Sequence, residues 1–157
     1  MKNESINISY QLLTADELTV EQQRTMASAR EAVKTAYSPY SNYQVGAAIL
    51  MENGAMVQGN NQENAVYPLG LCAERVALFN MGTLYPNIKP IMMALTVASA
   101  NKPGFPCGSC RQAMVEFSNR YHCNIPLLIE SVNDTFLYFE NAGQLLPFTF
   151  DQSNLSD

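Results

Sequence analysis

Three cysteines, in two short segments, have the residue type and spacing of a metal site. Cys107 and Cys110 are three residues apart at the expected start of a helix, so both thiolates can point at one ion. Cys72, which precedes Cys107 by 35 residues, supplies a third sulfur. Three protein ligands leave one tetrahedral position open, which is typical of catalytic zinc and not of structural zinc. We therefore expect one Zn²⁺ per chain.

Glu74 is the candidate catalytic residue beside these ligands. It follows Cys72 by two residues, too close to bind the same ion easily, but within reach of the open position, where zinc makes water a hydroxide source near neutral pH. Three thiolates, a glutamate that is not a ligand and a Pro-Cys-x-x-Cys segment together form the general pattern of zinc deaminases. Arg75 is close enough in sequence to donate to a ligand thiolate and withdraw some of its charge.

Parts of this pattern also occur in proteins of different function. A lone Cys-x-x-Cys is found as a redox pair or as half of a structural zinc site, and a zinc-stabilised binding module would give Glu74 no special role. Cys123 is expected to be a buried thiol. His122 is the only histidine, and we expect it to serve the surface or packing because three ligands are already available. The order of the two cysteine segments favours a catalytic zinc site.

Composition narrows the class of protein. Nine basic residues stand against fourteen acidic ones, giving a net charge of −5, which argues against binding to nucleic acid or to anionic membranes. No stretch reaches the ~18 apolar residues of a membrane span, and the polar N-terminus lacks the apolar core of a signal peptide. We expect a cytoplasmic protein whose cysteines are ligands or free thiols.

The patterns of hydrophobic and turn residues place both cysteine segments at the beginnings of helices. Helices are expected over residues 18–36, 71–80 and 108–119, and strands over residues 43–51, 55–59, 91–98, 125–130 and 135–140. Asn53-Gly54 predicts a hairpin turn, and Thr14 with Glu17 predicts a capping box before the first helix. The alternation predicts one α/β domain over residues 1–157, with a mixed sheet and a flexible polar tail at 152–157.

Several further segments resemble the cytidine deaminase family in its short, single-domain form. The resemblance runs from about Tyr37 to Phe150. It is carried by Tyr37-Ser38-Pro39-Tyr40-Ser41, Val45-Gly46-Ala47-Ala48, Gly59-Asn60-Asn61-Gln62-Glu63-Asn64-Ala65, Cys72-Ala73-Glu74-Arg75, Pro106-Cys107-Gly108-Ser109-Cys110-Arg111-Gln112 and Leu145-Leu146-Pro147. It implies a three-layer fold with a five-stranded mixed sheet and helices on both faces. It also implies hydrolytic deamination of free cytidine and deoxycytidine in pyrimidine salvage.

The resemblance implies roles for four residues around the nucleoside. Asn61 and Glu63 match the residues that hold the ribose, mainly through its 3′-hydroxyl, since a carboxylate that accepts and an amide that donates can bracket one hydroxyl. Tyr43 falls where the family usually has a phenylalanine against the nucleoside. The backbone N–H of Ala73 matches the donor to the pyrimidine O2.

Two aromatic residues match positions that the family uses between subunits. Tyr67 and Phe150 resemble rings that neighbouring subunits bring to each other's sites, which implies a homotetramer with shared active sites. Asn60 and Gln62 depart from the Cys and Val that the family often has, and Pro68 stands where a small residue is usual. Residues 1–15 extend beyond the resemblance, and the sequence assigns them no role.

Two related deaminase classes fit the sequence less well. Deaminases of the antibiotic blasticidin S resemble this family but lack the Glu-Asn-Ala segment that supports ribose binding, whereas Glu63-Asn64-Ala65 is intact here. A polynucleotide or nucleotide deaminase is disfavoured by the acidic net charge and by a cysteine, not a histidine, at position 72. We expect a small-molecule nucleoside substrate.

Overall fold

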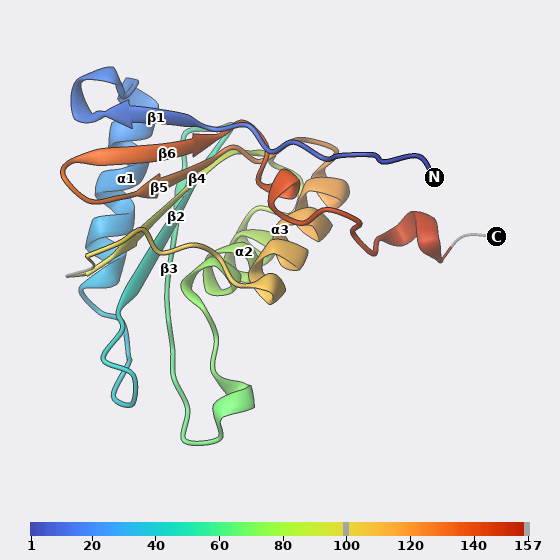
Figure 1. Ribbon diagram of the computed structural model, residues 1–157. Helices are drawn as coiled ribbons and strands as arrows, with labels where there is room; N and C mark the ends of the chain where they lie inside the picture. Colours follow the sequence, from blue (N-terminus) through green and yellow to red (C-terminus); the bar gives the residue numbers. More distant parts are fainter. Residues whose placement is uncertain (99–100, 156–157) are drawn as a thin grey trace.

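Three layers build the fold, with one sheet between α1 on one face and α2 and α3 on the other (Figure 1). The computed structural model describes residues 1–98 and 101–155. The strands are β1 (Gln11–Thr14), β2 (Val45–Met51), β3 (Met56–Asn60), β4 (Pro90–Val97), β5 (Leu127–Glu130) and β6 (Thr135–Phe139). The helices are α1 (Val20–Val33), α2 (Ala73–Leu84) and α3 (Gly108–Tyr121), with short 3-10 turns η1 (Ala15–Glu17), η2 (Tyr67–Leu69), η3 (Ala142–Leu145) and η4 (Gln152–Asn154).

Strand directions bring the beginnings of α2 and α3 to the same edge of the sheet. The strand order is β1-β6-β5-β4-β2-β3, and β2 is antiparallel to both β3 and β4, so β3 and β4 run in the same direction. β5 is parallel to β4. Because α2 connects β3 to β4 and α3 connects β4 to β5, both helices begin beyond the C-terminal ends of parallel strands. The two cysteine segments therefore meet.

The central strands are buried on both faces, as strands between two helical layers must be. In β2, Ala48 and Leu50 face α1, whereas Ile49 and Met51 face α2 and α3. The cluster on the α1 side contains Leu18, Met26, Ala29, Ala48, Leu50, Met92, Ala94, Leu128 and Phe136. The near-continuous apolar sequence of β2 thus reflects burial on two sides, and the prediction of a mixed sheet with helices on both faces is confirmed.

Within residues 1–98 and 101–155 the sheet has six strands, not the five expected. The additional strand, β1, lies in the N-terminal extension and pairs antiparallel with β6. Tyr10, just before it, packs its ring 5.6 Å from that of Phe139. Because only Leu13 of its four residues is partly buried, the inward face of β1 is too short for a periodic pattern to reveal. Part of the extension thus covers the edge of β6.

The first helix is capped by a different box from the one expected. The Thr14 backbone N–H donates to Glu17 Oε2 over 2.8 Å, but this box opens the short turn η1. α1 itself begins after Thr19, whose hydroxyl accepts from the Gln22 N–H while Gln22 Oε1 accepts from the Thr19 N–H. Both are reciprocal capping boxes, and the second one sets the helix start.

The hairpin turn predicted at Asn53-Gly54 is confirmed. Gly54 has a φ of +82°, a conformation that glycine adopts without strain.

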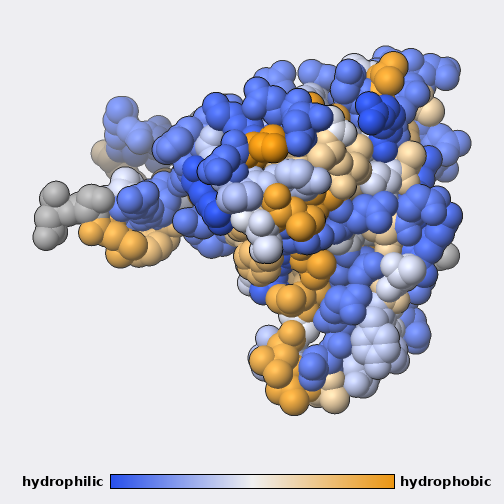
Figure 2. Space-filling model, turned by 180° about the vertical axis from the view of Figure 1, so that it is seen from behind, coloured by the Kyte–Doolittle hydropathy of each residue, from blue (hydrophilic) through white to orange (hydrophobic). Residues whose placement is uncertain are grey.

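In the expected tail, Gln152–Asn154 forms one 3-10 turn capped by Asp151, and residues 156 and 157 lie outside the described residues. Figure 2 shows apolar surface on the loop between β3 and α2, where Val66, Tyr67 and Leu69 are exposed. In the described residues, no helix is long and apolar enough to cross a bilayer.

Gly59 lets α2 approach the sheet closely, and we expect Gly59→Ala to destabilise the protein. A Cβ here would lie 2.4 Å from Ala77 N and 2.5 Å from Ala73 O, which are backbone atoms that cannot rotate away. Overpacking of this kind costs about 1–3 kcal/mol of unfolding free energy, measurable by urea denaturation. Gly108→Ala is the control, since nothing lies within 4 Å of its added Cβ. Equal stability of the two variants would contradict the prediction.

Candidate active site

The three cysteine sulfurs converge at the N-termini of two helices. Cys72 is the N-cap of α2, Cys107 is the N-cap of α3, and Cys110 lies in the first turn of α3. The Cys72 sulfur lies 3.9 Å from that of Cys107, which lies 3.5 Å from that of Cys110, and all three are within 4.8 Å of one another. Tetrahedral zinc with bonds of about 2.3 Å places its sulfurs about 3.8 Å apart. The cluster therefore has the spacing that zinc requires.

Hydrogen bonds and charges around the sulfurs favour the thiolate form of Cys72. The pKa of the Cys72 thiol is lowered to about 5, mainly by a hydrogen bond with Cys110, and Cys107 and Arg75 add to the lowering while burial opposes it. The same sulfur contact raises the pKa of Cys110. The two helix N-termini also favour negative charge. These effects suit the donor set to a cation that binds thiolates.

Arg75 lies beside Cys72 in the first turn of α2. Burial alone would lower the pKa of its guanidinium, but the hydrogen bond and charge of Cys72 outweigh burial and raise that pKa. Its Nη2 donates to the Gly70 carbonyl over 3.2 Å, and its buried Nε has no hydrogen-bond partner among the described residues. The positive charge of Arg75 therefore lies close enough to the Cys72 sulfur to interact with it.

We expect Arg75→Gln to release zinc at higher pH than the unmodified protein. Zinc binds deprotonated thiols, so protons compete with it as pH falls. Arg75 lowers the pKa of Cys72, and its loss raises that pKa, which moves the release midpoint upward by roughly one pH unit. A chromogenic zinc indicator follows the release, with the exposed Arg24→Gln as control. An unchanged midpoint would mean that Arg75 serves the fold alone.

Glu74 is a buried carboxyl beside the sulfur cluster. It lies in the first turn of α2 and is 5% exposed. Burial raises its pKa to about 7, and the negative charge of Cys72 acts in the same direction. A carboxyl that titrates near neutral pH can both accept and donate a proton under the conditions of a working enzyme. The geometry suits Glu74 to proton transfer.

One cleft contains most of the residues that the sequence singles out. It has a volume of about 540 Å³ and is lined by Ser41, Tyr43, Val45, Asn61, Gln62, Glu63, Tyr67, Gly70, Leu71, Cys72, Glu74, Val97, Gly104, Phe105 and Cys107. Ala73 is buried at the start of α2. Phe150 lies elsewhere, with its ring exposed and its carbonyl accepting from Gln112 Nε2 over 2.7 Å. The structure thus brings Cys72, Cys107, Glu74 and the expected ribose residues to one cavity, whereas Cys110 is buried and does not line it.

Asn61 and Glu63 are held in place by the turn before β2. Asn61 Oδ1 accepts from the Val45 N–H and its Nδ2 donates to the Tyr43 carbonyl, each over 2.8 Å. The Glu63 carboxylate accepts from the hydroxyl of Ser41 and from the backbone N–H groups of Tyr40 and Ser41. The Ser41 hydroxyl is the largest cause of the lowered pKa of Glu63, so the carboxylate is held ionised.

Sequence reasoning missed some residues that shape the site. Phe105 lines the cleft two residues before Cys107, and the one signal for it was an aromatic residue beside the Pro-Cys motif. Arg111, by contrast, was expected to serve the local fold or the tetramer, and it holds this segment, because its Nε donates to the Pro106 carbonyl and its Nη1 to the Leu145 carbonyl. These contacts fix the loop that presents Cys107.

The departures at residues 60 and 62 form a polar network that includes Gln62 of the cleft lining. Gln62 Nε2 donates to Asn60 Oδ1, and Asn60 Nδ2 donates to the Ala32 carbonyl and the Thr35 hydroxyl, both over 2.8 Å. The network ties the end of β3 to the end of α1. It therefore gives the two polar replacements a structural role.

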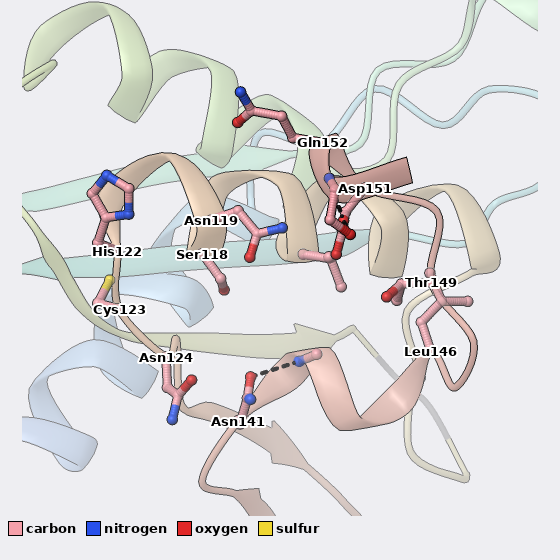
Figure 3. A pocket seen from close by; sticks show the side chains of 13 residues that line it. Ser118, Asn119, His122, Cys123, Asn124, Asn141, Leu146, Thr149, Asp151 and Gln152 are labelled. Atoms are coloured by element: carbon pink, nitrogen blue, oxygen red, sulfur yellow. Dashed lines mark hydrogen bonds between the residues drawn. The ribbon is translucent and has the colours of Figure 1, made fainter. Parts of the chain in front are cut away.

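His122 and Cys123 lie away from the sulfur cluster, at the C-terminal end of α3. They line a second cavity of about 820 Å³ between α3 and the C-terminal segment, with Asn119, Asp151 and other polar residues (Figure 3). His122 is exposed and has a φ of +51°, and Cys123 is half-buried, not fully buried as expected. Neither joins the three-sulfur cluster.

Known proteins match this chain over most of its length. Residues 19–123 match the family described as the cytidine and deoxycytidylate deaminase zinc-binding region. A cytidine deaminase of Halalkalibacterium halodurans is 34% identical over 88% of this chain and its own full length. One of Sporosarcina psychrophila is 33% identical over 85% of this chain and 94% of its own. The crystal structure of cytidine deaminase from Burkholderia pseudomallei superposes with a TM-score of 0.71 at 34% identity, covering 85% of this chain and all of that one. The chain belongs to the cytidine deaminase family.

Proposed function

We propose that this protein hydrolyses free cytidine and deoxycytidine to uridine and deoxyuridine, releasing ammonia, with one zinc ion held by Cys72, Cys107 and Cys110. The observation that carries the proposal is the three-sulfur cluster beside buried Glu74 in a cleft that also contains Asn61 and Glu63. A zinc-stabilised binding module has no need for a buried carboxyl at that position. A cytoplasmic place in pyrimidine salvage fits the four free cysteines.

Glu74 would move the protons of the reaction. When bound, zinc polarises water and supplies a nucleophile near neutral pH. Glu74 accepts a proton from the attacking water and delivers it to N3 of the pyrimidine as the C4–O bond forms. It then transfers the second proton to the amino group, so that the C4–N bond breaks and ammonia leaves. A pKa of about 7 for Glu74 supports both directions of transfer.

The other cleft residues would place the base over that centre. Glu63, already ionised, accepts from the sugar 3′-hydroxyl, and Asn61 Nδ2 has a second hydrogen beyond the one given to the Tyr43 carbonyl. The Tyr43 ring forms a wall of the cleft. Ala73, the first residue of α2, has a backbone N–H that is free of helix bonding and suited to the pyrimidine O2.

Direct assay tests the proposal. Purified protein is mixed with cytidine, deoxycytidine, CMP or cytosine, and conversion of each is followed by chromatography. We expect turnover of the two nucleosides and little of CMP, because no Lys or Arg is among the described residues that line the cleft, so none is there to bind a phosphate. Cytosine should also react poorly because it lacks the sugar that Asn61 and Glu63 would hold. Zinc binding without nucleoside turnover would favour the binding module, and efficient cytosine turnover would remove the ribose-binding roles.

We also propose a homotetramer in which Tyr67 and Phe150 reach the sites of neighbouring subunits. Both rings are exposed in the single chain, 73% for Tyr67 and 60% for Phe150. Tyr67 belongs to the apolar loop of Figure 2, next to exposed Val66 and Leu69. Exposed apolar surface of this kind is typical of an interface between proteins.

Complementation between a weakened chain and a zinc-dead chain tests the sharing of sites. Phe150→Ala should assemble normally but bind nucleoside more weakly. The loss of binding free energy should exceed the loss expected from buried apolar area alone by about 0.5–1.5 kcal/mol. Mixing it with zinc-dead Cys72→Ala chains should restore some complete sites, because one chain gives the metal and the other the ring. Activity is measured after subunit exchange has been confirmed by native mass spectrometry. No recovery would mean that each chain builds its site alone.

A further inference from the structure

A tight turn places the Ser41 hydroxyl between two parts of the cleft. Asn42, the next residue, has a φ of +55°, a left-handed conformation that asparagine tolerates better than most residues. The turn is closed by a hydrogen bond of 3.0 Å from the Asn42 N–H to the Ser38 carbonyl. It brings Ser41 beside both Glu63 and Tyr43, two residues that line the cleft.

Ser41 makes hydrogen bonds in both directions. Its hydroxyl donates to Glu63 Oε1 and accepts from the Tyr43 N–H over 3.0 Å. Its own N–H donates to Glu63 Oε2 over 3.2 Å, beside the Tyr40 N–H at 2.9 Å. Both oxygens of Glu63 are thus held before any sugar arrives. An exposed glutamate without such partners would lose rotamer freedom on binding.

Apart from the hydrogen bond from the Tyr43 N–H, the backbone of this region is held by contacts that do not involve the Ser41 hydroxyl. The Tyr37 N–H donates to the Asn61 carbonyl over 3.0 Å, and the Glu63 N–H donates to the Tyr37 carbonyl over 2.8 Å. The Asn61 side chain separately holds the backbone of Tyr43 and Val45. Removing the hydroxyl should therefore release Glu63 Oε1, while Oε2 keeps its two backbone partners and the turn keeps its path.

We propose that Ser41 is a positioning residue, which fixes the Glu63 carboxylate for the sugar and thereby sets the preference for nucleosides that carry a 3′-hydroxyl. The inference rests on the proposed function, because Glu63 is assigned to the sugar there. Ser41 acts through Glu63 and touches no reacting atom.

The test compares substrates with and without the sugar 3′-hydroxyl, the group that Glu63 would bind. Ser41→Ala should raise KM for cytidine about tenfold, the size of one hydrogen bond to a charged group, with little change in KM for 2′,3′-dideoxycytidine. Binding of uridine and 2′,3′-dideoxyuridine, measured by calorimetry, should show the same selective loss without any turnover. Ser41→Thr keeps the hydroxyl and should restore most of the preference. Ser38→Ala, in the same turn, is the matched control.

A double-mutant cycle tests whether Ser41 affects the KM for cytidine through Glu63. In a Glu63→Ala background, Ser41→Ala should add nothing to the cytidine KM, because residues that act through one contact are not additive. Additive losses, or an equal loss for both nucleosides, would overturn the inference. If Ser41→Ala does not fold, Ser41→Cys replaces it, since it keeps the size and weakens the donor. An unmodified protein that neither binds uridine nor deaminates cytidine would refute the proposed function, whereas an active protein with an unchanged preference in these variants refutes only the role of Ser41.

Discussion

Glu74→Gln should retain zinc and fold but lose turnover of cytidine by at least about 10²–10⁴-fold, the usual contribution of a positioned acid–base group. Glutamine keeps the size and hydrogen-bonding capacity of Glu74 but cannot carry a proton. The loss is expected at the upper end of this range or beyond it, because one carboxyl would serve several transfers. Turnover is measured with cytidine at saturation, beside zinc content per chain. Exposed Glu116→Gln is the control.

The same variant should not be less stable than the unmodified protein. Burial raises the pKa of Glu74 from 4.5 to about 7, so the folded state binds the proton more tightly than the unfolded state. The ionised side chain therefore costs stability, and this cost grows as pH rises from about 4.5 through 7. At about pH 8 the melting temperature of Glu74→Gln should equal or exceed that of the unmodified protein. Near-normal turnover by a folded, zinc-loaded variant would rule out Glu74 as the proton carrier.

Cys110→Ala should abolish both zinc binding and turnover. Cys110 is fully buried in the first turn of α3, and its sulfur lies within reach of both other sulfurs. Two remaining thiols cannot close a stable catalytic site, which needs three protein ligands. We expect zinc content to fall from about one per chain to near zero, with turnover reduced by more than about 10⁴-fold.

Cys123→Ala is the matched control for that experiment. The Cys123 sulfur lies 3.7 Å from the Pro90 carbonyl and outside the three-sulfur cluster. It should therefore keep one zinc per chain and normal turnover. X-ray absorption at the zinc edge should report three sulfurs in both this variant and the unmodified protein. A four-sulfur shell that loses one sulfur in Cys123→Ala would contradict an open catalytic site.

The sequence by itself determined the chemistry and most of the elements. The two cysteine segments were predicted at helix starts, and α2 and α3 begin at Ala73 and Gly108, directly after Cys72 and Cys107. The apolar run of β2 and the Asn53-Gly54 turn were equally readable, because burial and turn geometry leave local signals. Local sequence also placed Glu74 two residues from a ligand.

Only the tertiary structure decided which of these pieces meet. The shared direction of β3, β4 and β5 places the starts of α2 and α3 at one edge, and no local pattern encodes strand direction. The short edge strand β1 escaped prediction because it is defined by its pairing with β6, and Leu13 alone gives it an inward apolar side chain. The hold of Ser41 on Glu63 joins residues 22 positions apart, through a turn whose left-handed Asn42 is visible only in three dimensions. Long-range contacts of this kind depend on how the backbone is folded, because they join residues that local patterns do not relate.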